Sequence, residues 1–281
     1  MRAFFDDRPL VFAHRGASLH APANTELAFR RALEMGAHGL EADVRASRDG
    51  VAVVCHDATL EGVTDASGPV ARRSYDELRT LDAGYRWSPD GGRTFPYRGR
   101  GLRLLRAESL LDAFPDVRFI FHIKSRAAGP PARRAIEAAG AEERVLVAAE
   151  WGHRLRAFRG YAGPLGTSTE EATPFVLACR LGLRPSARHA FLAPPTRFGV
   201  RVLSRRFVAC AHAAGQPVVA YVINEVERMQ EYLRWGVDAI ETDRIDVALD
   251  QIREWGPARR ETAGRGRGPG PASNTRQESS S

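Results

Sequence analysis

Short apolar runs alternate along the chain with longer stretches whose apolar residues recur at the spacing of one helix face. The first run, LVFAH at 10–14, precedes a helical pattern that begins near Asn24-Thr25-Glu26. Strands that alternate with helices through short loops are typical of a parallel sheet covered by helices. Further strand-like runs cover 38–44, 51–56, 118–124, 144–149, 163–167, 189–193, 217–223 and 237–242.

The number of runs predicts how the sheet closes. Eight or nine strand-like runs fit a closed barrel better than a doubly wound sheet, and no GxGxxG follows the first strand. Helical patterns over 204–214 and 225–235 each stop at a glycine, the expected C-terminal signal. We therefore expect an α/β protein with a single (β/α)8 TIM-type barrel over residues 1–256.

Two segments interrupt the alternation. Residues 57–107 contain one short helical pattern and a loop rich in Gly, Arg and Pro, and we interpret them as an insertion between the third and fourth strands. This insertion would form a lid or wall at the active face. Residues 257–281 are rich in Gly, Pro and Ser without apolar periodicity, which predicts a disordered tail.

Composition excludes some classes of protein. The 281 residues suit one barrel, no apolar run approaches the roughly 18 residues of a membrane span, and the N-terminus lacks a secretory pattern. Cys55, Cys179 and Cys210 are odd in number and widely spaced, which predicts neither a disulfide framework nor a CxxC metal site. We therefore expect a cytoplasmic protein without stable membrane insertion.

The net charge of +7 is compatible with nucleic-acid binding, but its distribution argues against it. Residues 257–281 hold five Arg and two Glu, so the tail supplies +3 and the body +4. The arginines of the body are scattered rather than gathered with aromatic residues. We expect a solvated basic surface and no nucleic-acid partner.

Polar side chains end the strands predicted in the first half. The first ends in His14-Arg15, and the third in His56-Asp57. Side chains two apart on a strand share a face, so Glu41 points with Asp43 on the second strand and His122 with Lys124 on the fourth. Working residues of β/α barrels lie at these strand ends. Two carboxylates that point into one small cavity repel each other, and a bound divalent cation is the simplest way to relieve that repulsion.

Lys124 is unusual for its residue type. Of the 41 basic residues it is the one lysine, and the other 40 are arginine. A position that keeps Lys against such a bias indicates a need for a compact point charge rather than a planar guanidinium.

Short motifs follow one another along the chain: FAHRGA at 12–17, APANT at 21–25, LEADV at 40–44, CHD at 55–57, HIK at 122–124 and GVDAIETDR at 236–244. In order and spacing, over about residues 9–250, they resemble the motifs of the bacterial glycerophosphodiester phosphodiesterases. The resemblance implies a barrel enzyme that cleaves a small-molecule glycerophosphodiester to glycerol 3-phosphate and an alcohol with bound Ca²⁺ or Mg²⁺.

The resemblance also implies roles. His14 and His56 would be the general acid–base pair, acting through attack of the neighbouring glycerol hydroxyl and a cyclic phosphate that water opens. Lys124 would be functional, and Arg15 would bind phosphate oxygens. Glu41 and Asp43 would hold the metal. Tyr221 stands where the family often has Trp and would either contact the glycerol carbons or serve as a plain core aromatic residue.

Three positions depart from the family pattern. His122 replaces the Glu of the Glu-x-Lys motif, which is the third metal carboxylate. With His122 as a ligand, the site would have less negative charge and would shift its preference towards Mn²⁺, Co²⁺ or Zn²⁺. Ala23 replaces a Glu, and Glu150 ends the fifth strand where an aromatic residue is usual. Glu150 could compensate for the carboxylate missing at 122, or could simply begin the next helix.

Two other functions remain compatible with this sequence. One is phospholipase D-like cleavage of lysophospholipids on the same barrel, which a wide or apolar rim around 57–107 would favour. The other is a degenerate barrel that binds phosphodiesters without turnover. His122 favours the degenerate barrel, and the intact pair His14 and His56 argues against it.

Overall fold

Parallel strands surround a common axis in the computed structural model, which describes residues 3–193, 196–197 and 200–264, with side chains over 4–193 and 202–255. Parallel bridges from Val147 to Leu165 and from Gly166 to Ala190 close the ring. The weak run predicted at 163–167 therefore takes the eighth place in the barrel. Neighbouring strands, in order, are β5 (Val145–Ala148), β4 (Arg118–Ile123), β2 (Gly39–Ala46), β1 (Leu10–Ala13), β10 (Ala239–Thr242), β9 (Val218–Ala220) and β6 (Phe191–Ala193).

Side chains that point into the barrel fill its amino-terminal half. Phe4 and Phe5, from a short 3-10 helix over Ala3–Phe5, join this interior cluster. Gly39 makes room for it, because a Cβ there would lie 2.4 Å from the Phe12 ring. Apolar residues of the barrel interior are Leu10, Phe12, Ile120, Leu146, Ala148, Ala190, Val219 and Ala239.

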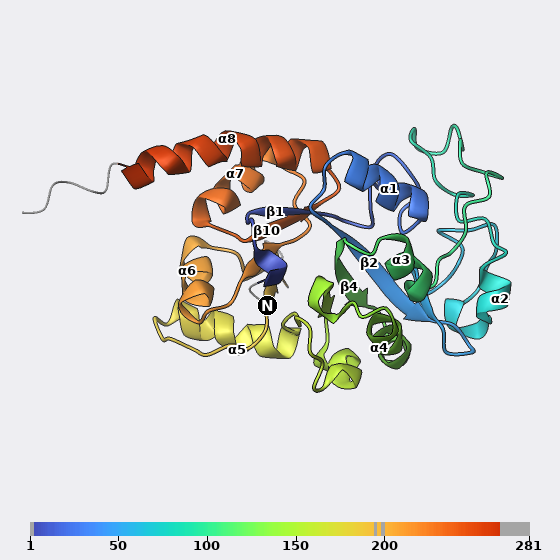
Figure 1. Ribbon diagram of the computed structural model, residues 1–281, viewed down its shortest axis with the longest axis horizontal. Coiled ribbons are helices and arrows are strands. Elements are labelled where there is room, and N and C mark those ends of the chain that lie inside the picture. Colours follow the sequence, from blue (N-terminus) through green and yellow to red (C-terminus); the bar gives the residue numbers. More distant parts are fainter. Residues whose placement is uncertain (1–2, 194–195, 198–199, 265–281) are drawn as a thin grey trace, which may run out of the picture.

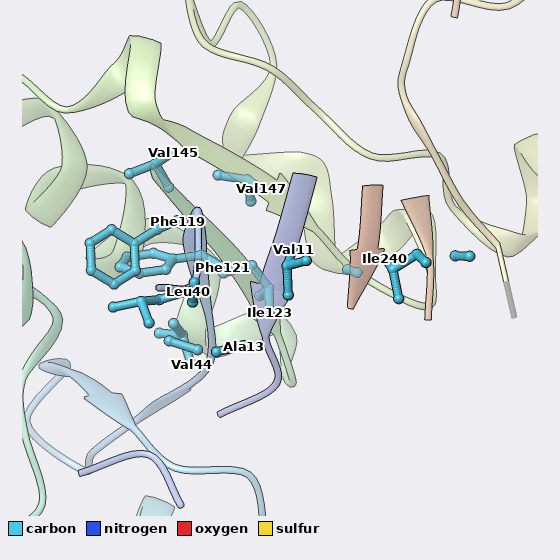
Figure 2. Close-up of a cluster of buried hydrophobic side chains, with 14 of the residues drawn as sticks. Val11, Ala13, Leu40, Val44, Phe119, Phe121, Ile123, Val145, Val147 and Ile240 are labelled. Carbon is cyan, nitrogen blue, oxygen red and sulfur yellow. The ribbon is translucent and has the colours of Figure 1, made fainter. Parts of the chain in front are cut away.

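The alternate residues of the same strands point outwards and form the layer between barrel and helices. Figure 2 shows Val11, Leu40 and Phe121 within this layer. In Figure 1, α1 and α3 lie on one side of the molecule and α5 and α6 on the other. The helices are α1 (Glu26–Glu34), α2 (Tyr75–Leu78), α3 (Ala107–Ala113), α4 (Gly129–Ala138), α5 (Thr169–Arg180), α6 (Arg205–Ala213), α7 (Val226–Trp235) and α8 (Ile245–Gly264).

Helix ends follow local sequence signals. Thr25 caps α1, where its hydroxyl accepts a hydrogen bond from the Ala28 N–H, and Ser204 caps α6 in the same way from Phe207. Gly236 ends α7 at φ 87°, a conformation that glycine adopts without strain. The helices predicted over 204–214 and 225–235 are confirmed.

Strand β3 (Ala52–Val54) corrects one prediction, because it is not a barrel strand. It pairs antiparallel with β2, and β2 pairs directly with β4. The turn at Asp49-Gly50 is too short for a crossover between parallel strands, which takes a dozen residues or more. The segment 57–107 follows this hairpin and contacts both α1 and the loop before it. Trp87 Nε1 donates a hydrogen bond to the Ser18 carbonyl in that loop (3.0 Å), and Arg31 of α1 donates one to the Tyr97 hydroxyl (3.1 Å).

A disulfide joins Cys179 of α5 to Cys210 of α6, so the expectation of unpaired cysteines is wrong. The two residues are 31 apart in sequence, but their Cα atoms lie 6.1 Å apart because α5 and α6 are neighbours. Sequence spacing could not reveal that proximity. Because disulfides persist chiefly in oxidising compartments, the cysteines no longer support a cytoplasmic location.

Helix α8 runs through the first part of the segment predicted as a disordered tail. It extends to Gly264, so residues 257–264 are helical, and 265–281 lie outside the described residues. No helix within the described part of the chain has the length and apolarity needed to cross a bilayer.

Candidate active site

Polar side chains gather at the mouth of the barrel, where the strands have their carboxyl ends. His14 follows β1, and its Nδ1–H donates to Asp243 Oδ1 (2.8 Å), just after β10. Ser18 and Asn224 also donate to this carboxylate. Burial alone would raise the pKa of Asp243, but the hydrogen bonds from His14 and Asn224 outweigh it and lower the pKa to about 2. Asp243 is therefore ionised and accepts the hydrogen bond that orients His14.

Arg15 and Gly16 form a left-handed turn after β1. Their φ angles are 57° and 79°, and a Cβ on Gly16 would lie 2.7 Å from the Ala28 carbonyl carbon. Only glycine suits this position. The turn directs the Arg15 N–H to Glu41 Oε2 (3.0 Å) and brings Arg15 Nε within 3.0 Å of Asp43 Oδ2.

Asp43 is fully buried on β2 and is surrounded by donors. Asn24 holds it twice, through Nδ2 to Asp43 Oδ2 (2.9 Å) and through the Asp43 N–H to Asn24 Oδ1 (3.2 Å). Lys124 Nζ lies 2.7 Å from Asp43 Oδ1. Burial tends to raise the pKa of Asp43, but the cations Lys124 and Arg15 hold it well below its usual range. Asp43 is therefore ionised.

Glu41 and Glu241 share the barrel interior with Asp43. Burial, then Asp43 and Glu241, raise the pKa of Glu41 well above its usual value. Burial also raises the pKa of Glu241 to about 7, with Asp43 adding to the shift and His14 opposing it. Carboxylates this close together in a buried site favour a bound cation or proton.

His122 lies beside Asp43, since the two are paired in the register of β2 and β4. Burial and the nearby Lys124 lower the pKa of His122 to about 3. Lys124 Nζ donates to His122 Nδ1 (3.2 Å), so the imidazole is neutral and acts as an acceptor.

His56 follows β3 on another side of the cluster. Its Nδ1 lies 2.7 Å from Asp57 Oδ1, and Arg45 Nε donates to its carbonyl. Burial lowers the pKa of His56, although Asp57 opposes the shift. His56 and Arg15 line a cavity of about 200 Å³, the β3 pocket, whose wall includes Gly62, Val63, Ala83, Arg86, Trp87 and Leu104 of the 57–107 segment.

Tyr221 lines a different cavity, of about 300 Å³, on the far side of the barrel mouth. We call it the α5 pocket, because α5 forms one wall. His122 and Glu150 also border it, and its apolar lining is Ala148, Ala149, Ala172, Val176, Leu177, Phe191, Leu192, Ala193, Val202 and Phe207.

The structure brings the predicted metal residues Glu41, Asp43 and His122 together, with one ligand atom from each within 4.8 Å of the others. A second such group is His14, Glu41 and Glu241. Asp43 Oδ1 is buried beside the Lys124 ammonium, whose Nζ lies 2.7 Å away. A carboxylate oxygen can accept from more than one partner, so Glu41 and Asp43 fit a divalent cation.

Glu150 belongs to neither group. Its side chain is 43% exposed, and its Oε2 lies 3.9 Å from Arg154. Its contribution to a metal site stays a prediction.

Sequence reasoning missed three residues of the site: Asn24, Asp243 and Glu241. Asn24 and Asp243 stood within the matched motifs without an assigned role. The signal for Glu241 was present, because it is a charged residue within an apolar strand and shares a face with Asp243 two positions on. That rule had identified the pair Glu41 and Asp43.

Known proteins resemble this chain over nearly all of the barrel. The sequence model of the Glycerophosphoryl diester phosphodiesterase family matches residues 14–155 and 165–247. A relative from Mycobacterium tuberculosis, "Probable glycerophosphodiester phosphodiesterase 2", is 33% identical over 253 residues, which cover 86% of this chain and 90% of the relative. A glycerophosphodiester phosphodiesterase from Caldanaerobacter subterraneus is 28% identical and covers 89% of this chain and 100% of its own length.

Solved structures share the fold. The glycerophosphoryl diester phosphodiesterase domain of a Mycobacterium tuberculosis protein superposes with a TM-score of 0.77 at 22% identity, over 88% of this chain and 100% of that chain. A phosphodiesterase from Oleispira antarctica, solved with the product sn-glycerol-3-phosphate, has a TM-score of 0.72 at 20% identity, over 89% of this chain and 99% of that chain.

Proposed function

Because this chain belongs to the glycerophosphoryl diester phosphodiesterase family, we propose that it hydrolyses glycerophosphodiesters to glycerol 3-phosphate and an alcohol. The chain is accordingly a phosphoric diester hydrolase. The observation that carries the detailed proposal is the His14–Asp243 pair beside the carboxylates Glu41 and Asp43. An imidazole that a carboxylate orients, next to a candidate cation site, is an arrangement suited to phosphodiester cleavage.

His14 and His56 provide acid–base chemistry in this proposal. Each imidazole has its Nδ1 against a carboxylate, Asp243 for His14 and Asp57 for His56, which leaves Nε2 for the substrate. One imidazole removes the proton from the attacking hydroxyl, and the other gives a proton to the leaving alkoxide.

Arg15 and Lys124 supply positive charge for the phosphate. Arg15 lines the β3 pocket, and Lys124 stands between Asp43 and His122 at the mouth. A guanidinium suits two phosphate oxygens at once, whereas an ammonium acts as a point charge. Glu41 and Asp43 would hold a divalent cation, which neutralises phosphate charge and orients the scissile bond when bound.

A metal-screened assay tests this function. Glycerophosphocholine is incubated with the metal-stripped chain plus each divalent cation, and glycerol 3-phosphate is detected by a coupled enzyme. We expect metal-dependent release that His14→Ala abolishes. Binding of the diester without turnover under every metal would instead identify a degenerate barrel.

The α5 pocket favours lysophospholipids as a second class of substrate. Its lining is mainly aliphatic and aromatic, and it adjoins His122 and Tyr221 at the mouth. Leu177 on its edge is 58% exposed, and Leu181 and Leu183 beyond it are also exposed. Such a surface suits an acyl chain attached to the glycerol. This pocket lies at α5, whereas the 57–107 rim considered from sequence lines the β3 pocket with His56 and Arg15.

Lysophosphatidylcholine tests this second substrate class. If the α5 pocket takes the acyl chain, Ala172→Phe should reduce cleavage of lysophosphatidylcholine and leave glycerophosphocholine hydrolysis near normal. The exposed Leu19→Ala, on the loop after β1, is the matched apolar control. Equal losses on both substrates would restrict the proposal to water-soluble diesters.

A further inference from the structure

Glu241 is a buried carboxylate that no structural contact explains. It lies on β10 with 4% of its surface exposed, and within the described residues its side-chain carboxylate accepts no hydrogen bond and forms no ion pair. The buried Asp238, just before β10, shows the contrast. Arg8, His212 and the Val218 N–H all form hydrogen bonds with its carboxylate. A buried carboxylate without a partner is costly unless a ligand completes it.

Glu41 links Glu241 to the predicted metal residues. On one side Glu41 groups with Asp43 and His122, and on the other with His14 and Glu241, each time within 4.8 Å. The strand order β4, β2, β1, β10 explains why, since β2 lies between the two groups. Burial raises the pKa of both Glu41 and Glu241, and the charge of Asp43 adds to each shift.

The group of Glu41, Asp43 and His122 has less negative charge than it would have with a carboxylate at position 122. The His122 imidazole is neutral, and it accepts a hydrogen bond from Lys124, so Glu41 and Asp43 are the two anionic ligands there. Glu241 brings a third carboxylate into the same interior from the opposite direction. His14 forms a hydrogen bond with Asp243, and in the proposed function it transfers protons rather than binding the metal.

We propose that Glu241 is a ligand of the divalent cation, which it shares with Glu41, and that it replaces the carboxylate absent at position 122. Oxygen atoms of Glu41 on β2 and Glu241 on β10 would then hold the ion. Oxygen ligands favour Mg²⁺, Ca²⁺ or Mn²⁺ over Zn²⁺ and Co²⁺, in contrast to the preference expected if His122 binds the metal. This inference rests on the metal site of the proposed function and extends it to a new ligand.

Mn²⁺ binding without substrate tests the ligand directly. Free Mn²⁺ is followed by electron paramagnetic resonance during titration of the metal-stripped chain, with Mg²⁺ and Ca²⁺ as competitors. We expect Glu241→Gln to weaken Mn²⁺ binding at least about 10–100-fold, since even outer partners of metal ligands have effects of this size. Glu34→Gln, at the exposed carboxyl end of α1, is the matched control and should bind Mn²⁺ as the wild type does.

A rescue variant separates ligation from folding. His122→Glu, added to Glu241→Gln, should restore Mn²⁺ affinity, because it returns a carboxylate to the same ion from the other side. Metal-free Glu241→Gln should melt no lower than the wild type, since an unpaired buried carboxylate has been neutralised. Wild-type Mn²⁺ affinity in Glu241→Gln, or no Mn²⁺ binding by the wild type, would overturn the inference. Normal metal binding without diester hydrolysis would instead contradict the proposed function alone.

Discussion

Asp243 Oδ1 lies 2.8 Å from His14 Nδ1, although the two residues are 229 positions apart in the chain. β1 and β10 are neighbours in the closed barrel, so the residues that follow them meet at its mouth. The carboxylate fixes the tautomer and the orientation of the His14 imidazole.

Asp243→Asn should therefore lower kcat by about 10²-fold or more on glycerophosphocholine, because the amide no longer holds the imidazole in the required tautomer and orientation. Steady-state kinetics give the comparison. Asp246→Asn, on the exposed surface of α8, is the control and should behave as wild type. A loss below a few-fold would show that His14 does not need Asp243.

His14→Ala and His56→Ala should each reduce turnover by about 10²–10⁴-fold without unfolding the barrel. Both side chains lie at the mouth and outside the apolar clusters of the core. Circular dichroism and thermal melting check the fold. More than half of wild-type activity in either variant would contradict the acid–base assignment.

Lys124→Arg should damage activity severely, although the chain uses arginine almost everywhere else. The Lys124 side chain is 14% exposed and lies 2.7 Å from Asp43 and 3.2 Å from His122, which leaves no room for a guanidinium. Arg30→Lys, in an exposed ion pair on α1, is the reciprocal control and should have no effect. Near-normal kinetics in Lys124→Arg would mean that a point charge is not required.

Stability of the metal-free chain should fall as pH rises through the titration of Glu241. Its pKa is raised from 4.5 to about 7, so the folded state keeps a proton that the unfolded chain releases. Between about pH 4.5 and about pH 7, the free energy of unfolding therefore decreases as pH rises. Scanning calorimetry in chelator should show Glu241→Gln gaining stability over the wild type across this range. A constant difference in melting temperature would falsify the assigned shift.

Reduction of the Cys179–Cys210 disulfide should destabilise the chain by about 2–4 kcal/mol, because the bond closes a loop between α5 and α6. Denaturant unfolding with and without reductant measures the change. The Cys179→Ser, Cys210→Ser double variant should match the reduced chain, and Cys55→Ser, at the buried free thiol, should stay sensitive to reductant. Equal unfolding midpoints with and without reductant would contradict the prediction.

The local pattern of the sequence was sufficient for the barrel and for much of the site. Alternation of strands and helices predicted the fold class, and the two-residue period of a strand placed Glu41 with Asp43 and His122 with Lys124. Positions such as Thr25 and Gly236 marked helix ends because capping depends on a few adjacent residues. These features are encoded within one element or its flanks.

The tertiary structure alone decided which elements are neighbours. It turned β3 antiparallel against β2, joined Cys179 to Cys210, and brought Asp243 to His14 and Glu241 to Glu41. Each of these last three contacts spans a long stretch of chain and exists because closing the sheet sets β1 between β2 and β10, or packs α5 on α6. Closure is driven by burial of the whole apolar layer, so no single segment carries its signal.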